Sequence, residues 1–191
     1  MPSLKGSATE KNLLTAFAGE SQARNRYSFF AKQARKEGFE QIGAIFEETA
    51  DQEQAHAKRL FSFLEGGEVE FTAAFPAGII ATTEENLRAA AAGEKHERSS
   101  MYPEFAKTAK AEGFGEIAGV MLAIAKAEMM HEERYLALAA SIASGKVFKK
   151  DGEKRWKCRK CGYTHTGESA PDKCPACAHP QSYYEQLAEN W

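Results

Sequence analysis

The feature that most constrains the fold of this chain is an internal repeat. Residues 30–42 (FAKQARKEGFEQI) and 105–117 (FAKTAKAEGFGEI) are identical at eight of thirteen positions, and AGE recurs at 18–20 and 92–94. A repeated unit of this length predicts a duplicated helical hairpin. The second copy has one extra residue between its AGE and FAK segments, in the stretch that holds Pro103. We therefore expect its first helix to kink there.

Apolar residues recur at spacings of three and four around both copies, which predicts four helices. Gly38 and Gly113 interrupt the two hairpins at equivalent positions. Residues 66–82 are far too long for a hairpin turn. Fully extended, these seventeen residues reach roughly 56 Å, which exceeds the length of a 30-residue helix, about 45 Å. We expect an all-α antiparallel four-helix bundle with one long crossover.

Seven glutamate and histidine side chains fall on helix stripes that otherwise hold apolar residues. A buried, unpaired carboxylate costs several kcal/mol, so five glutamates in one core require cations. Two divalent ions neutralise them better than one. The predicted metal ligands are Glu20, Glu53, His56, Glu94, Glu97, Glu128 and His131.

Two Glu-x-x-His pairs, at 53–56 and 128–131, organise this set. Glutamate at i and histidine at i+3 share one helix face, so each pair can hold one metal while Glu20 and Glu94 bridge or cap. Ordinary surface glutamates are disfavoured, because both pairs are in phase with the apolar stripe. Oxygen-rich ligation with some imidazole suits iron or manganese, and spacing does not decide between them. Ferritin-like di-metal proteins use this pattern.

The four cysteines form two C-x-x-C knuckles separated by twelve residues. All lie within the last 34 positions, which favours one local metal centre over a disulfide framework. Four thiolates in a tetrahedron bind structural zinc or a single iron, and spacing leaves both open. Attachment to a redox-capable bundle favours iron, since zinc does not transfer electrons. The predicted ligands are Cys158, Cys161, Cys174 and Cys177.

Net charge and hydropathy exclude some classes of partner. The formal charge is -2 and the pI is about 6.2, so no general attraction for nucleic acid or an anionic membrane is expected. No apolar run has membrane-spanning length, and residues 1–30 lack the pattern of a signal peptide. We predict a soluble cytoplasmic protein whose partner is a small molecule or another protein.

Several segments together resemble the rubrerythrin family over essentially the whole chain. They are AGESQARNRY (18–27), ETADQEQAHAKRLF (48–61), FPAGIIA (75–81), AGEKHE (92–97) and CPACAHP (174–180). The resemblance implies a ferritin-like bundle followed by a rubredoxin-like domain.

The resemblance also implies the cofactors and the roles of individual residues. Two non-haem irons would be held by Glu20, Glu53, Glu94, Glu97, Glu128 and His131, with His56 exchanging with Glu97 on reduction. One further iron would bind the four cysteines, while Tyr27 and Tyr102 would hydrogen-bond to ligand carboxylates.

The activity implied by the resemblance is peroxidase chemistry in oxidative-stress defence, the reduction of hydrogen peroxide to water. The electrons would come from rubredoxin or an NAD(P)H-dependent reductase. A ferroxidase or iron-handling protein is the main alternative, because the same bundle serves ferritins. A zinc-ribbon adaptor is a weaker alternative, because it would not need a complete ligand set.

We expect three segments: a bundle at 1–145, a linker at 146–155 and a cysteine domain at 156–191. The bundle continues about fourteen residues beyond the Glu128–His131 pair, so the tail would depart roughly 20 Å from the two-metal site. Electron transfer weakens steeply over such a gap. We therefore expect a homodimer or higher oligomer in which the cysteine centre of one chain serves the site of another.

Overall fold

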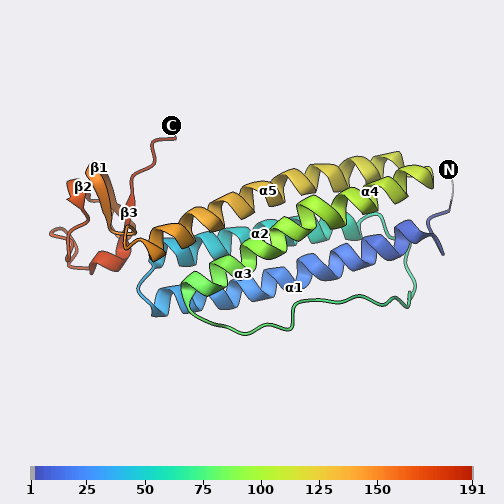
Figure 1. Ribbon diagram of the computed structural model, residues 1–191, viewed down its shortest axis with the longest axis horizontal. Helices are drawn as coiled ribbons and strands as arrows, with labels where there is room; N and C mark the ends of the chain where they lie inside the picture. Colours follow the sequence, from blue (N-terminus) through green and yellow to red (C-terminus); the bar gives the residue numbers. More distant parts are fainter. Residues whose placement is uncertain (1–2, 191) are drawn as a thin grey trace.

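The computed structural model describes residues 3–190 as an elongated helical bundle with a small sheet at one end (Figure 1). Four long helical arms run antiparallel, and the third arm is divided into three segments. The elements of the bundle are α1 (Ala8–Lys36), α2 (Glu40–Phe61), α3 (Thr83–His96), the π-helix η1 (Glu97–Met101), α4 (Tyr102–Ala111) and α5 (Gly115–Ala143).

Local sequence explains where the helices begin and end. The Ser7 hydroxyl accepts a hydrogen bond from the Glu10 backbone N–H, capping α1. Thr82 and Glu85 form a reciprocal capping box before α3. Gly38 and Gly113 have φ of +85° and +87°, a conformation that terminates a helix without the steric cost of a Cβ atom. Both hairpins therefore turn at the glycines predicted from the repeat.

The predicted crossover lies along the outside of the bundle. Residues 66–82 contain no helix or strand and run beside α1 from one end of the bundle to the other (Figure 1). The crossover returns the chain to the end of the bundle where α1 turns into α2, and α3 starts there. For this reason α3 runs antiparallel to α1. The one-crossover topology predicted from loop length is confirmed.

The extra residue of the second repeat forms a π-helix instead of a simple proline kink. Glu97–Met101 is π-helical, and Pro103 lies in the first turn of α4, directly after it. One residue inserted into a helix is accommodated by a wider turn, and such turns occur often at functional sites. The irregularity was therefore predicted in the correct stretch, but its form was not.

A polar layer divides the buried interior of the bundle into two apolar clusters. On α1, Leu13 belongs to one cluster and Tyr27 to the other, with Glu20 between them. On α5, Ile124 and Tyr135 belong to different clusters in the same way. The predicted metal ligands therefore lie halfway along the bundle, where apolar packing supports them on both sides.

The small C-terminal sheet is antiparallel with strand order β2-β1-β3. Its strands are β1 (Lys149–Cys158), β2 (Thr164–Ser169) and β3 (Tyr184–Gln186). Strand β1 already covers most of the expected linker at 146–155. Phe148, directly before β1, stacks on Phe39 at the start of α2, with ring centroids 6.2 Å apart. The C-terminal domain therefore contacts the end of the bundle where α1 turns into α2. Among the described residues, no helix is long and apolar enough to cross a membrane.

Candidate metal centres

Six of the seven predicted bundle ligands gather in two overlapping groups. One contains Glu20, Glu53, His56 and Glu128, and the other contains Glu53, Glu94, Glu128 and His131; within each group the ligand atoms lie within 4.8 Å of one another. Glu53 and Glu128 belong to both. Of the two roles left open for Glu20 and Glu94, this arrangement suits capping, while the shared pair is placed to bridge two ions.

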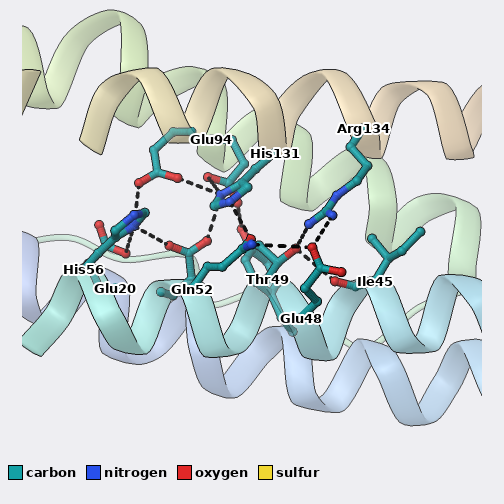
Figure 2. A network of polar contacts seen from close by, with 12 residues as sticks. Glu20, Ile45, Glu48, Thr49, Gln52, His56, Glu94, His131 and Arg134 are labelled. Atoms are coloured by element: carbon teal, nitrogen blue, oxygen red, sulfur yellow. Dashed lines mark hydrogen bonds and ion pairs between the residues drawn. The ribbon is translucent and has the colours of Figure 1, made fainter. Parts of the chain in front are cut away.

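The imidazole rings of His56 and His131 lie among the carboxylates, with ring centroids 6.1 Å apart (Figure 2). His56 Nδ1 lies 3.0 Å from Glu128 Oε1 and 3.1 Å from Glu53 Oε2. His131 Nδ1 lies 2.7 Å from Glu128 Oε2 and 3.2 Å from Glu53 Oε1. Each histidine therefore contacts both shared carboxylates, although the two come from different helices.

The buried carboxylates fit a bound cation. Several buried atoms among the described residues make no contact with hydrogen-bond geometry, although some of them lie within ion-pair distance of one another. They are Glu20 Oε2, Glu53 Oε1, Glu94 Oε2, both carboxylate oxygens of Glu128, and His131 Nδ1. Orphaned acceptors of this kind are costly unless something compensates them. They point into the same two groups, so positive charge is what the site requires.

The local electrostatics show the same demand. Burial, together with Glu53 and Glu128, raises the pKa of Glu94 to about 7. Burial and the neighbouring carboxylates also raise the pKa of Glu20 well above its ordinary value. Burial disfavours a charged His131, but contacts with Glu128 and Glu53 outweigh this and raise its pKa to about 11. The concentrated negative charge thus attracts any cation within reach.

Two tyrosines support the carboxylates across the bundle. The Tyr27 hydroxyl donates to Glu94 Oε1 at 2.5 Å, and the Tyr102 hydroxyl donates to Glu20 Oε1. Both rings are fully buried. Since Tyr27 and Tyr102 occupy equivalent places in the repeat, each copy supplies a tyrosine to the glutamate of the other. The hydrogen bonds implied by the resemblance are present.

Glu97 is the predicted ligand that the structure leaves outside both groups. It starts the π-helix and is half-buried. Burial and the carboxylates of Glu20 and Glu94 raise its pKa well above the ordinary value, which places it within electrostatic reach of the cluster. His56 is therefore inside the cluster and Glu97 beside it.

Sequence reasoning missed the residues that hold the ligands in place. The Gln52 side-chain oxygen lies 3.0 Å from His131 Nε2 (Figure 2). The Arg98 guanidinium pairs with the buried Glu132, which ties η1 to α5. Gln52 and Glu132 each adjoin a predicted ligand in sequence, but adjacency alone did not distinguish them from surface residues.

The four cysteines form the predicted tetrahedral set. Cys158 Sγ and Cys177 Sγ are 3.8 Å apart, and Cys161 Sγ and Cys174 Sγ are 3.7 Å apart. A metal with bonds of about 2.3 Å to sulfur in a regular tetrahedron separates the sulfurs by about 3.8 Å. A disulfide needs about 2.05 Å. The spacing thus fits a metal and excludes disulfide pairing.

Comparison with known proteins agrees with both sites. The family model described as Rubrerythrin matches residues 11–139, and the model described as Rubrerythrin, rubredoxin-like domain, matches residues 156–185. The chain belongs to the rubrerythrin family. Membership confirms the predicted ferritin-like bundle followed by a rubredoxin-like domain. It also confirms that the chain is a di-iron protein of the oxidoreductase class.

Rubrerythrins of two bacteria are similar to this chain throughout. Identity to the rubrerythrin of Nitratidesulfovibrio vulgaris is 61% over 191 residues, covering all of both chains. Identity to that of Porphyromonas gingivalis is 62% over 189 residues, covering 99% of this chain and 94% of the relative. A solved structure described as a mixed-valence state of nigerythrin matches with a TM-score of 0.64 and 36% identity, covering 97% of this chain and 88% of that one.

Proposed function

We propose that the protein is a di-iron peroxidase that reduces hydrogen peroxide to water. The observation that carries this proposal is the presence, in one chain, of two buried groups of potential metal ligands that share Glu53 and Glu128 and of a separate four-cysteine site. When bound, a ferrous pair supplies the two electrons that, with two protons, convert one peroxide molecule into two water molecules. Nigerythrin structures similar to this chain are described as mixed-valence, partially reduced and all-ferrous states, which supports iron over manganese.

In this proposal the tyrosines orient the capping carboxylates. Tyr27 and Tyr102 hold one oxygen of Glu94 and of Glu20, leaving the other oxygen of each free for a metal. Burial and the nearby glutamates raise the pKa of both phenols well above the ordinary value, so each keeps its proton and remains a donor. Fixed ligands of this kind need little reorganisation during turnover.

We propose that all seven bundle residues serve as ligands, with His56 and Glu97 alternating. His56 comes from α2 and Glu97 from η1, so they approach the cluster from different arms of the bundle. We expect His56→Ala to retain two metals per chain while peroxide reduction falls by about tenfold or more. Metal analysis beside steady-state kinetics checks this; unchanged kinetics at full loading would contradict the exchange.

In this proposal the four-cysteine centre relays electrons to the two-metal site. We further propose that the protein acts in the cytoplasm, where it defends the cell against oxidative stress. Cys161 is exposed while Cys158 and Cys174 are buried, so one edge of the centre is accessible to an electron donor. Rubredoxin or an NAD(P)H-dependent reductase is the proposed electron source.

We propose that the relay operates between chains of a homodimer. The sheet lies beyond the end of the bundle (Figure 1). Helix α5 continues for twelve residues after His131, so the end of the helix lies about 18 Å from His131 along the helix axis, at 1.5 Å per residue. A second copy placed head to tail would bring its cysteines nearer. Mixing Cys158→Ala chains with Glu53→Ala/Glu128→Ala chains should restore part of the donor-dependent activity, and verified heterodimers without activity would rule the crossing out.

Steady-state peroxide reduction by the purified, iron-loaded protein tests the main proposal. We expect turnover with a rubredoxin-linked donor, and its loss in Glu53→Ala/Glu128→Ala. Metal analysis should give two irons in the bundle and one in the cysteine site. Rapid oxidation of added ferrous iron without peroxide turnover would instead favour the ferroxidase alternative, and zinc on the cysteines would contradict the relay.

A further inference from the structure

Glycines inside long helices are unfavourable relative to alanine, so each one suggests a local reason. A methyl group at Gly43 would lie 2.8 Å from Arg35 Cγ and 3.1 Å from the Ala31 carbonyl oxygen, so the packing of α1 on α2 requires glycine there. Gly119 on α5 has no atom within 4 Å of the same position and faces open space. The Cβ position of neither glycine contacts a predicted metal ligand.

The two glycines of the repeated AGE motif differ from both. A Cβ atom at Gly19 would lie 3.8 Å from Phe75 Cε1 and 3.9 Å from Glu97 Oε1, and one at Gly93 would lie 3.7 Å from Arg26 Nη2. These are ordinary contact distances, so packing alone does not require glycine at either position. Each glycine directly precedes a predicted ligand, Glu20 or Glu94.

Gly19 and Gly93 line the same pocket, which measures about 380 Å³. Its walls come from α1 and from the α3–η1–α4 arm, and crossover residues 72–76 complete it. Glu97, which lies beside the carboxylate cluster, also lines the pocket. A water molecule occupies about 30 Å³ in the liquid, so hydrogen peroxide fits easily.

A second opening reaches the site from the other side of the bundle, between α2 and α5. It measures about 440 Å³ and is lined by residues that include His56, His131 and Met130. Both imidazole rings line this opening, with centroids 6.1 Å apart, and none of the five predicted carboxylate ligands does. On the crossover side, Glu97 is the only predicted ligand that lines the pocket.

We propose that the pocket beneath the crossover is the passage by which hydrogen peroxide reaches the two-metal site, with Gly19, Gly93 and Phe75 setting its width. This proposal rests on the proposed peroxidase function and names its substrate class: hydrogen peroxide and other small hydroperoxides. A side chain larger than alanine at either glycine would take up space in this pocket, and Phe75 lines it from the crossover, 3.8 Å from the Cβ position of Gly19. In this proposal the constriction beside Phe75 admits hydrogen peroxide more readily than bulky hydroperoxides.

Rapid mixing of the reduced, iron-loaded protein with peroxide tests the passage without an electron donor. Gly19→Leu should slow oxidation by hydrogen peroxide by on the order of tenfold or more at unchanged metal content. Phe75→Ala should raise the rate with cumene hydroperoxide relative to hydrogen peroxide. Gly19→Ala should raise Tm by about 1–4 °C, because glycine is not needed there for packing.

Gly119→Leu is the matched control, since it places the same side chain on a helical glycine that faces open space; it should change neither rate. Met130→Trp plugs the opposite opening at an exposed residue and should also leave both rates unchanged. If Met130→Trp slows oxidation, Gly19→Leu does not, and Phe75→Ala leaves the ratio of the two hydroperoxide rates unchanged, the substrate enters beside the histidines and the proposal is wrong.

Azide binding to the oxidised protein, followed by absorption, separates this proposal from the peroxidase assignment. Gly19→Leu should slow azide binding whether or not peroxide is the substrate. Slower azide binding in a protein that does not reduce peroxide would uphold the passage and overturn the proposed function. If the protein reduces peroxide normally and Gly19→Leu changes neither the rate of azide binding nor the rate of oxidation by peroxide, the proposed function is upheld and the passage is overturned.

Discussion

The bundle and the C-terminal sheet each build a metal site from a duplicated motif, but they depend on the metal to different degrees. The bundle encloses its carboxylates between two apolar clusters of more than ten buried residues each. The sheet has a single cluster of five buried residues, and two of them, Cys158 and Cys174, are metal ligands. A large core can carry the cost of a polar layer, whereas a small one needs its metal to fold.

Removing the metals should separate the two regions most clearly. We expect strands β1 and β2 to lose amide protection entirely, because metal binding in small tetrathiolate domains contributes on the order of 10 kcal/mol to folding. The helices of the bundle should remain protected. Hydrogen exchange before and after chelation measures both, with Cys158→Ser as a genetic equivalent. Protected strands in the metal-free protein would contradict the comparison.

Ending the chain at Ser144 should cost less. The truncated bundle should stay helical and bind two metals, since its apolar clusters contain no residue of the sheet. The contact between Phe39 and Phe148 is lost, so a modest drop in Tm is expected. Circular dichroism, metal analysis and donor-dependent turnover test this. Failure to fold, or normal turnover with the same donor, would show that the regions are not independent in the way proposed.

Changes to the tyrosines should affect the bundle site without unfolding it. Tyr27→Phe or Tyr102→Phe removes one hydrogen bond to a capping carboxylate, and we expect about 10–100-fold loss in metal affinity or turnover. Tyr135→Phe is the matched control, because this buried hydroxyl has no hydrogen-bond partner among the described residues. Metal titrations of the three variants should separate Tyr135 from the other two; equal losses would point to packing as the cause.

The smallest expected effect concerns the two cysteine knuckles. Gly162 has φ of +81° and its counterpart Ala178 has φ of +60°, a conformation that disfavours a side chain. Ala178→Gly should stabilise the cysteine domain by about 1 kcal/mol, and Gly162→Ala should destabilise it similarly. Denaturant unfolding followed at the thiolate-to-metal absorption band measures both. No gain from Ala178→Gly would mean that the second knuckle is not strained.

The sequence predicted those parts of both regions that depend on local geometry. In a helix, i and i+3 always share a face, so the pairing of Glu53 with His56 and of Glu128 with His131 followed from spacing. The two C-x-x-C knuckles likewise predicted a four-thiolate metal site from spacing alone. The turns at Gly38 and Gly113 and the crossover at 66–82 followed from glycine position and loop length.

Contacts between distant segments required the tertiary structure. Tyr27 and Glu94 are 67 residues apart, and nothing in their spacing showed that each repeat supports the glutamate of the other. Neither the placement of His56 inside the cluster with Glu97 beside it, nor the pocket between Gly19 and the crossover, could be derived from one helix. Such contacts depend on how separate helices align, and one residue of shift turns a side chain by about 100°. Spacing within a helix is set by backbone geometry, but alignment between helices is decided only when the whole core packs.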